Sequence, residues 1–585
     1  MDEQEVRQAT QRYGSRTLES QFQISPVYHT PLPLKPHLCN VCCSEVRIGH
    51  TLSEAERQHV AKRRYKVQEC LIKTGIHCPE DKVPNIAVLG SGGGLRAMIS
   101  LLGSLSQLKE GALLDSIMYL CGVSGSTWCM ASVYDKKDWS TNLETLNKNI
   151  IQRLAEGSVS WSAIGEKLVK YYNEKKDNFS LTDVWAAVIV SKMVKEINEN
   201  KLSGQRNNYP KDPYPVYTVI DKQCKCENLL ADSWFEITPD DSGYSLTGAY
   251  VDSTSFGSQF NNGQKIQHWP EMDMLYLQGL CGSALGDTEE IKKAIYEAIK
   301  HLIKGKIGCM EESRTPPEQK ADKVLLALVD LNLCVLNGED PTQYLKTLKE
   351  LLKEKHPEAE ECTLHVLKKV TSGEKISEEE AQKYTLCVCK IIIVSFEGGM
   401  WDVIKKAFQR IWGWTWGTTN NFIYNMKVKD VHPSVLQSQT RPYIDAGLLL
   451  NSPYFTALRK ERHVDLIISL DFSSGDPFLT VKEAAKMCKE RHIPFPNVVI
   501  PKEKTPLDFY VFEGSGDVPT VIHIPLFNIV NCNGEVEKWR ERYSTSKWTY
   551  SREDITDLME KAALNIKNNK KKLIQEIEKT ISKNK

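Results

Sequence analysis

The sequence predicts an α/β fold in which helices flank a central, mostly parallel sheet. Two short apolar runs, residues 85–89 and 117–121, are each followed by glycine and then by a segment with helical spacing. The order strand, glycine loop, helix, strand, tight turn, helix is typical of parallel sheets with helices on their faces. Apolar residues make up 41% of the 585 residues, enough for the sizeable core of such a fold.

Further elements are predicted from the same kinds of pattern. Residues 53–56 read Ser-Glu-Ala-Glu, which resembles a helix start, and the charged segment that follows has helical spacing to Lys73. Later in the chain, short apolar runs predict strands. The predicted helices after the two strands cover 95–108 and 127 onward, and the later strands cover 464–470, 498–500 and 521–524.

Composition divides the chain into an arm, a large domain and a terminal helix. Residues 1–50 contain several prolines and predict an irregular arm, whereas residues 51–565 carry the strand and helix patterns of one domain. Within that domain, residues 286–395 alternate Lys and Glu densely, which predicts a charged helical insertion with solvated faces.

The last segment, residues 566–585, predicts a basic amphipathic helix. Leu573, Ile577 and Ile581 recur every four residues among many lysines. Two interpretations stay open. Such a helix can touch anionic lipid, or it can pack its apolar side on the domain and leave its lysines in water.

The overall charge and the cysteine content restrict the class of protein. Lys+Arg and Asp+Glu both number 75, so nothing in the whole-chain charge favours nucleic-acid binding. No apolar run approaches the roughly 20 residues that a membrane-spanning helix needs, and the acidic N-terminus lacks the apolar stretch of a signal peptide. We therefore expect a cytoplasmic protein whose 17 cysteines stay reduced.

One cysteine cluster raises the question of zinc. Cys39, Cys42 and Cys43 lie close together with His37 nearby, but no second pair follows at ligand spacing. We expect free thiols here, and neither a metal nor a cofactor.

The first motif with chemical meaning is at residues 122–126, which read Gly-Val-Ser-Gly-Ser between a predicted strand and a predicted helix. A serine on such a sharp turn has its hydroxyl above the sheet edge, beside a helix N-terminus that can stabilise an oxyanion. Ser124 is therefore a candidate nucleophile. The pattern alone fits a plain glycine- and serine-rich turn equally well.

The second motif, residues 90–98, reads Gly-Ser-Gly-Gly-Gly-Leu-Arg-Ala-Met. A Walker A loop is excluded because no Gly-Lys-Ser/Thr follows. A dinucleotide fingerprint survives by pattern, with Gly92, Gly94 and Ala97 as its small residues and Asp115 further on. The third interpretation is an oxyanion loop of the esterase kind, and a serine elbow after the next strand favours it.

The third motif, residues 443–447, reads Tyr-Ile-Asp-Ala-Gly and is followed by Asn-Ser-Pro at 451–453. An aspartate at a strand end before a glycine turn can project into a site. By itself this signal is weak, since such turns are common.

Together these three motifs resemble the cytosolic phospholipase A2 family, which is related to patatin-like lipases, and most of all its short gamma type. Four further stretches agree with that family, and the likeness covers most of residues 50–565, weakening in the 286–395 insertion. The stretches are residues 234–239, 256–260, 414–422 and 469–473.

The resemblance implies a Ser/Asp dyad within a phospholipase A2 catalytic domain at 51–565. It assigns the nucleophile to Ser124 and its base to Asp445, and it assigns the oxyanion N–H groups to Gly93 and Gly94. Two arginines, Arg96 and Arg462, would hold the substrate phosphate or an anionic intermediate. A Ser–His–Asp triad stays open as well, because His463, His492 and His523 all follow Asp445.

The implied activity is hydrolysis of fatty-acyl esters of glycerophospholipids through an acyl-enzyme, with lysophospholipase and acyl-transfer activity from the same intermediate. Only 84 residues precede the first predicted core strand, too few for a C2 domain of ordinary size, and no EF-hand loop appears, so we expect calcium-independent activity. The sequence also lacks a C-terminal prenylation cysteine. We therefore expect peripheral contact with intracellular membranes through the basic tail or an apolar surface.

Two alternative functions stay open. A dinucleotide-binding oxidoreductase would use the glycine loop, and bound cofactor in the purified protein would reveal it. A catalytically silent lipid-binding relative is the other alternative, against which the intact Ser124 and Asp445 argue.

Overall fold

A mixed sheet forms the centre of the computed structural model, which describes residues 45–207, 211–283, 288–309, 316–353, 356–393, 400–500, 505–545 and 547–583. Within these residues the sheet has 12 strands, and β11 lies beside β4 off the main path together with β10. In spatial order the strands are β1 (Val46–Ile48), β7 (Ala249–Asp252), β6 (Asp241–Tyr244), β5 (Trp234–Ile237), β4 (Tyr214–Asp221), β3 (Tyr119–Gly122), β2 (Ile86–Gly90), β12 (Leu466–Asp471), β14 (Thr520–Pro525) and β13 (Tyr510–Phe512), with β11 (Thr440–Asp445) and β10 (Thr418–Asn420) beside them.

Five neighbouring strands, β4, β3, β2, β12 and β14, run parallel, as the sequence predicts for the centre of the sheet. The strands on either side of this group pair antiparallel. The residues of β2, β3 and β12 are all buried, which is the expected consequence of helices covering both faces of a parallel sheet.

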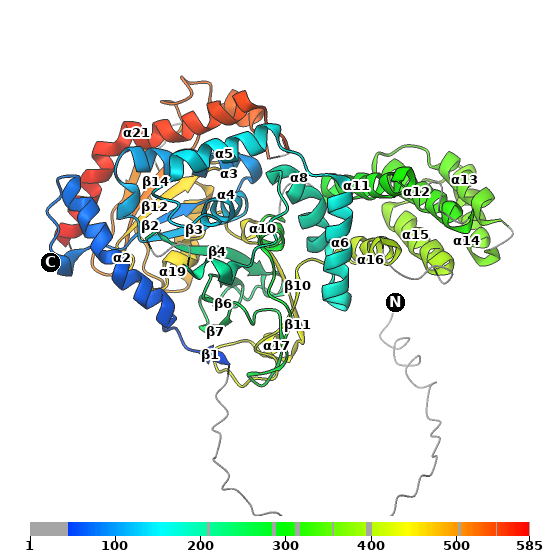
Figure 1. The fold of residues 1–585 in the computed structure, drawn as a ribbon, viewed down its shortest axis with the longest axis horizontal. Coiled ribbons are helices and arrows are strands. Elements are labelled where there is room, and N and C mark those ends of the chain that lie inside the picture. The colour runs from blue at the N-terminus through cyan, green and yellow to red at the C-terminus, as the bar shows by residue number, and fades with distance from the viewer. Residues whose placement is uncertain are drawn as a thin grey trace, which may run out of the picture. The chain divides into compact units, whose positions relative to one another are not determined.

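Helices cover both faces of the parallel strands (Figure 1). On one side lie α3 (Gly94–Glu110), α4 (Gly125–Tyr134), α5 (Leu143–Glu156) and α21 (Arg552–Lys583), and on the other lie α2 (Glu54–Lys73) and α19 (Leu479–Glu490). Ser53 caps α2 by accepting a hydrogen bond from the Glu56 N–H, as its predicted helix start implies.

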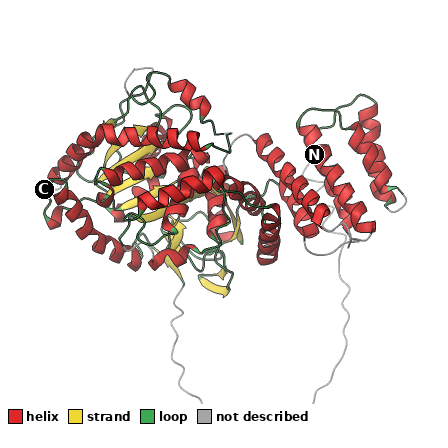
Figure 2. Cartoon of the chain, turned by 45° about the horizontal axis from the view of Figure 1, so that its top comes forward, coloured by secondary structure: helices red, strands yellow, loops and turns green. Residues whose placement is uncertain are grey.

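The charged insertion is helical, as its composition predicts, and helices continue past residue 395 (Figure 2). Each consecutive pair of its helices packs together, with leucines such as Leu345 and Leu348 turned inward. The helices are α11 (Thr288–Cys309), α12 (Pro316–Leu336), α13 (Thr342–Leu352), α14 (Pro357–Thr371), α15 (Glu378–Ile393) and α16 (Met400–Trp412).

Apart from short 3-10 turns, the remaining helices and strands connect these layers. They are α6 (Trp161–Lys175), α7 (Leu181–Val184), the π-helix Trp185–Val190, α8 (Ser191–Val194), α9 (Lys222–Cys226), α10 (Met274–Cys281), α17 (Pro433–Gln437), α18 (Tyr454–Ala457), α20 (Val536–Arg542), and the hairpin of β8 (Gln259–Asn261) and β9 (Gln264–Gln267).

Three of the predicted segments differ from the structure, two in their bounds and one in its secondary structure. The predicted arm 1–50 includes β1, which pairs with β7 at the sheet edge, while residues 1–44 with the cysteine cluster lie outside the described residues. The predicted strand 498–500 is wrong, because residues 493–500 form no regular structure, and prolines at 494 and 496 remove the N–H groups that a strand needs. The predicted terminal helix 566–585 is the second half of the continuous helix α21.

None of the helices that the structure describes combines the length and apolar character needed to cross a membrane.

Candidate active site

Ser124 occupies a strained turn between β3 and α4. Its backbone has φ 52° and ψ −126°, a conformation that residues with a Cβ rarely adopt, and it directly precedes the first residue of α4. A Cβ at Gly125 would overlap the carbonyl oxygen of Gly94, so only glycine lets the turn pass this close to the neighbouring loop. The geometry is that of a nucleophile elbow. Ser124 is only 4% exposed.

The neighbouring loop ends β2 and starts α3. Gly93 has φ 150° and Gly94 has φ 59°, both in the region that favours glycine. Within the described residues, no atom of the chain accepts a hydrogen bond from the N–H of Gly93 or of Gly94. These N–H groups lie at the N-terminus of α3, where partial positive charge favours an anion.

Asp445 is the last residue of β11, which pairs antiparallel with β4, and its side chain is 0% exposed. Its N–H donates to Ser283 Oγ at 3.1 Å, and its Oδ1 accepts from the Gly447 N–H at 2.8 Å. These contacts fix the position of the carboxylate.

Two features hold β11 in place. Arg441 forms a buried ion pair with Asp221 at the end of β4, with Nε to Oδ2 at 2.6 Å. On the other side of the strand, Tyr443 N–H donates to the Gly417 carbonyl, and a Cβ at Gly417 would overlap Tyr443. Gly417 belongs to one of the stretches that carried the family resemblance, and its role is to support the strand that ends in Asp445.

The elbow, the glycine loop and the aspartate turn meet at the carboxyl end of the parallel strands. A Cβ added at Gly92 would lie 2.8 Å from Ser124 Cβ and would overlap the Asn451 side chain. A Cβ added at Gly447 would lie 3.0 Å from Asn451 Oδ1 and 3.1 Å from Asp445 Oδ1. Three segments that are far apart in sequence therefore surround one small volume.

Asn451 is the residue of this cluster to which the sequence assigned no role. Its Nδ2 donates to the Gly92 carbonyl at 3.3 Å and to Ser473 Oγ at 2.9 Å. Its own carbonyl accepts from the Gly92 N–H at 3.2 Å. The only signal in the sequence was its place six residues after Asp445, within a motif already noted.

Arg96 lies beside the glycine loop, as its position in the motif predicts. Its Nε donates to the Phe472 carbonyl at 2.7 Å and its Nη1 to the Tyr543 carbonyl at 2.6 Å. Its Nη2 is 2.7 Å from where a Cβ on Gly93 would be. Burial lowers the pKa of this guanidinium from its ordinary value, and within the described part of the chain Arg96 forms no ion pair.

Arg462 lies elsewhere, which corrects the expected pairing of two arginines at one site. It precedes β12, at the amino end of the parallel strands, whereas Ser124 follows the carboxyl end of β3. Its guanidinium is buried against Glu56 and Glu236, with Nε to Glu56 Oε1 and Nη1 to Glu236 Oε2 both at 2.8 Å. Its charge is neutralised there, so we do not assign it a role toward the substrate.

The histidines considered for a triad are also away from this cluster. His463 and His492 line a cavity with Asp465 and Thr520, at the amino end of the strands. His523 is buried on β14, with Nε2 2.7 Å from the Pro477 carbonyl. This placement favours the dyad over the triad.

The dinucleotide alternative fits the structure poorly. Asp115 precedes β3 and forms an ion pair with Lys66 at 2.9 Å. It therefore lies at the amino end of the sheet, whereas a ribose-binding carboxylate belongs at the carboxyl end, next to the glycine loop.

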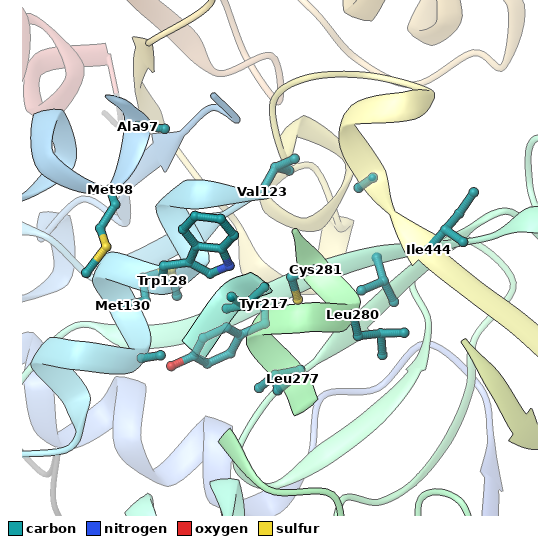
Figure 3. Packing of buried hydrophobic residues seen from close by; sticks show 14 of the residues in the cluster. Ala97, Met98, Val123, Trp128, Met130, Tyr217, Leu277, Leu280, Cys281 and Ile444 are labelled. Carbon is teal, nitrogen blue, oxygen red and sulfur yellow. The ribbon is translucent and has the colours of Figure 1, made fainter. Parts of the chain in front are cut away.

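Apolar side chains pack beneath the elbow (Figure 3). Val123, Trp128 and Cys281 lie near one another, contributed by the elbow, α4 and α10, and Ile444 on β11 belongs to the same buried cluster. Trp128 Nε1 donates to the Gln278 carbonyl at 2.8 Å, which ties α4 to α10. Burial raises the pKa of the Cys281 thiol, and the nearby Asp445 carboxylate adds to this effect. This packing excludes water from the underside of the site.

Comparison with known proteins places the chain in a family. Residues 86–288 match the family model described as the lysophospholipase catalytic domain, and this segment contains both the glycine loop and the elbow. Cytosolic phospholipase A2 gamma of Mus musculus is 35% identical over 567 residues, covering 90% of this chain and 91% of that protein. The Homo sapiens protein of the same name is 34% identical and covers 91% and 96%.

The fold agrees with that assignment. The solved structure of human GIVD cytosolic phospholipase A2 superposes with a TM-score of 0.62 at 21% identity, covering 92% of this chain and 66% of that one. Because the sequence identity to the gamma proteins extends over nearly the whole of both chains, the chain has a phospholipase A2 or lysophospholipase catalytic domain and belongs to the cytosolic phospholipase A2 family.

Proposed function

We propose that the protein hydrolyses fatty-acyl esters of glycerophospholipids and lysophospholipids through a Ser124–Asp445 dyad, without calcium. The observation that supports this most is the meeting of three features in one buried volume: a strained serine, a glycine loop with N–H groups available, and an aspartate fixed at a strand end.

In the first half-reaction Asp445 accepts the hydroxyl proton of Ser124 while the serine oxygen attacks the ester carbonyl. The N–H groups of Gly93 and Gly94 receive the developing oxyanion, an interaction worth about 3–4 kcal/mol per donor in other hydrolases. As the tetrahedral intermediate collapses, the proton passes to the departing oxygen of the lysophospholipid. The acyl group is then bound to Ser124 as an ester.

In the second half-reaction Asp445 accepts a proton from water, whose oxygen attacks the acyl-serine. Collapse of this intermediate releases the fatty acid and returns the proton to Ser124. A lysophospholipid substrate reacts at the same serine, and an alcohol in place of water gives acyl transfer.

A solvated aspartate is a weak base for a serine hydroxyl, so the burial of Asp445 is part of the proposal. The side chain has no exposed surface, and its Oδ1 is oriented by the Gly447 N–H. Burial disfavours the charged form of a carboxylate and so makes proton transfer from the serine less unfavourable, whereas the hydrogen bond from Gly447 serves to orient the group.

Arg96 is the cation that we assign to the anionic part of the substrate or intermediate. It is buried next to Gly93 and donates to backbone carbonyls, and within the described residues it forms no direct ion pair, although the Asp471 carboxylate is close enough to favour its charge. A guanidinium in such surroundings favours a phosphate or an oxyanion nearby.

Access to phospholipid requires contact with a membrane surface, and we propose that the protein is cytoplasmic and binds membranes peripherally. Leu448, three residues after Asp445, is 46% exposed. An apolar side chain in water this close to the site can insert among the acyl chains of a bilayer.

The test is release of fatty acid from phosphatidylcholine vesicles by the wild type and by Ser124→Ala and Asp445→Asn, each with excess chelator. We expect each variant to lose at least about 10³-fold in kcat, as removal of a nucleophile or its base does elsewhere. The chelator should change nothing. A His463→Ala/His492→Ala double variant serves as the control and should keep its activity.

Either of two results would overturn the mechanism. Full activity of Ser124→Ala would show that Ser124 is not the nucleophile, and loss of activity in the histidine variant would replace the dyad by a triad. Inhibition by the chelator would refute only the calcium-independence.

A further inference from the structure

Two thiols face each other across a helix pair of the charged insertion. Cys362 on α14 and Cys387 on α15 have their Sγ atoms 3.3 Å apart. Both side chains are half-buried, so each thiol can be reached from solvent. The pair lies in the insertion, which contributes none of the residues assigned above to the active site.

The other described cysteines differ from this pair. Of those whose side chains the structure describes, ten are buried and Cys226 is exposed. Within the described residues no other two thiols come within contact distance, and no group of three or more metal-ligating side chains gathers. Cys362 and Cys387 therefore form a pair of thiols, and the described residues add no further side chain that would make this pair a metal site.

Cys387 also lines a surface cavity of about 440 Å³. Lys383 and Lys390 lie on the same wall, and Trp412 lines it from α16. Glu358 also lines the cavity, and Lys383 forms an ion pair with Glu379 at 2.7 Å, so Lys390 is the lining lysine that we expect to attract a carboxylate of a small thiol or disulfide.

We propose that Cys362 and Cys387 form a site of reversible disulfide formation, with Cys387 as the attacking thiol and glutathione disulfide as the oxidant. The Cys387 thiolate attacks one sulfur of glutathione disulfide, which forms a mixed disulfide and releases one glutathione as thiolate. The Cys362 thiolate then attacks the Cys387 sulfur, which closes the Cys362–Cys387 bond and releases the second glutathione. Two protein thiols are oxidised, and one glutathione disulfide is reduced to two glutathiones.

Two side-chain contacts hold α14 against α15. The hydroxyls of Thr363 and Tyr384 are 2.6 Å apart, and Lys369 on α14 forms an ion pair with Glu380 on α15 at 2.5 Å. A disulfide requires the sulfur atoms to approach by only about 1.3 Å from their present separation. Side-chain rotation and a small shift of the helices can supply that movement.

The roles of the two thiols follow from their surroundings. Cys387 borders the cavity and meets the oxidant first, whereas Cys362 faces Cys387. Burial, and then the contact with Cys387, raise the pKa of the Cys362 thiol to about 11. The closing step should therefore accelerate as pH rises from 7 to 9, because the attacking species is the thiolate.

The experiment incubates the reduced full-length protein with glutathione disulfide, quenches it with acid, and alkylates the remaining thiols before proteolysis and mass spectrometry. We expect a linked pair of peptides containing Cys362 and Cys387, two hydrogen atoms lighter than the separate peptides and lost on reduction. Cys362→Ser should accumulate the glutathione adduct on Cys387. Cys387→Ser should leave Cys362 reduced, and Cys226→Ser is the matched control that keeps the link.

A second probe tests the spacing without any oxidation. An aromatic trivalent arsenical binds two thiols that lie within a few ångströms of each other. Because Cys39, Cys42 and Cys43 are close together in sequence, every protein in this test carries serine at those three positions. In that background the protein with the Cys362–Cys387 pair and its Cys226→Ser variant should bind the arsenical, and either serine variant at the pair should not. Complete alkylation of Cys362 and Cys387 after glutathione disulfide treatment, while Cys226 carries the adduct, would overturn the proposal. So would arsenical binding that survives both serine substitutions. Neither outcome depends on the hydrolase activity proposed above.

Discussion

At Asn451 a single side chain joins the glycine loop to the segment that follows Asp445. Replacing it by alanine removes the donors to the Gly92 carbonyl and to Ser473 Oγ. The N–H groups of Gly93 and Gly94, which we propose receive the oxyanion, would then be less firmly placed, and a displacement of about 1 Å can cost about 10²-fold in rate. We expect Asn451→Ala to lose about that much in kcat with little change in KM.

The measurement is a full Michaelis analysis on a dispersed lysophospholipid, with thermal unfolding in parallel. Asn451→Leu, which is close in shape, loses the N–H groups without adding a charge, and it should resemble the alanine variant. Asn200→Ala removes an exposed asparagine that donates to Asp135 and is the matched control. If kcat is preserved while KM rises, Asn451 contacts substrate and does not act by positioning the loop.

Single residues of the site were predictable from the sequence where a local motif contained them. Ser124, Asp445, Gly93 and Gly94 each lie in a local motif at a strand end, and the structure brings them together. The position of Arg462 was not predictable in this way. Its ionic partners, Glu56 and Glu236, are 406 and 226 residues away in sequence, and a charged residue carries no local sign of which distant carboxylate it meets.

Among the elements, α2 depends on a histidine that must stay neutral. His59 is buried, and its Nε2 donates to the Asp212 carbonyl at 3.0 Å, which attaches α2 to the start of β4. Burial, and secondarily Arg63, lower the pKa of His59 to about 3. The unfolded chain binds a proton at this residue below about pH 6.5, whereas the folded chain does so only near pH 3.

This difference makes the folded state less stable as the pH falls. The contribution of His59 is fully present above about pH 6.5 and is lost progressively toward pH 3, with a loss of about 2 kcal/mol at pH 5. Urea unfolding at pH 7.5 and pH 5 measures the effect. Between these two pH values the free energy of unfolding of His59→Gln should fall by less than that of the wild type, although at pH 7.5 it is already lower. His268→Gln, at an exposed histidine, should follow the wild type. An equally steep loss in His59→Gln would show that other groups govern the acid sensitivity.

Predictions of whole elements succeeded where one stretch of sequence carried the signal. The strands at 85–89 and 117–121 and the helix after Ser53 all form within a few residues of the expected bounds. The strand predicted at 498–500 failed because an apolar run was read without its flanking prolines. β1 was missed because its three residues become a strand only by pairing with β7, about 200 residues later in the chain.

For the molecule as a whole, α21 is part of the core. Leu573, Ile577 and Ile581, which the sequence left open between lipid contact and packing, are all buried. The helix lies against α3 so closely that a Cβ at Gly103 would be 2.9 Å from Met559 Cα. Its apolar side is therefore occupied, and only its exposed lysines remain for contact with an anionic membrane.

Removing residues 566–585 should consequently abolish the fold, and not merely weaken lipid binding. The three buried aliphatic side chains contribute about 1.5–3 kcal/mol each, a sum comparable to the whole stability of a typical domain. We expect the truncated chain to lack a cooperative unfolding transition in differential scanning calorimetry. The matched variant Lys567→Gln/Lys570→Gln/Lys571→Gln, at exposed positions of the same helix, should keep the wild-type transition within a few degrees. A truncated chain that unfolds like the full one would mean that α21 only rests on the domain, in which case its apolar side would again be available for a membrane.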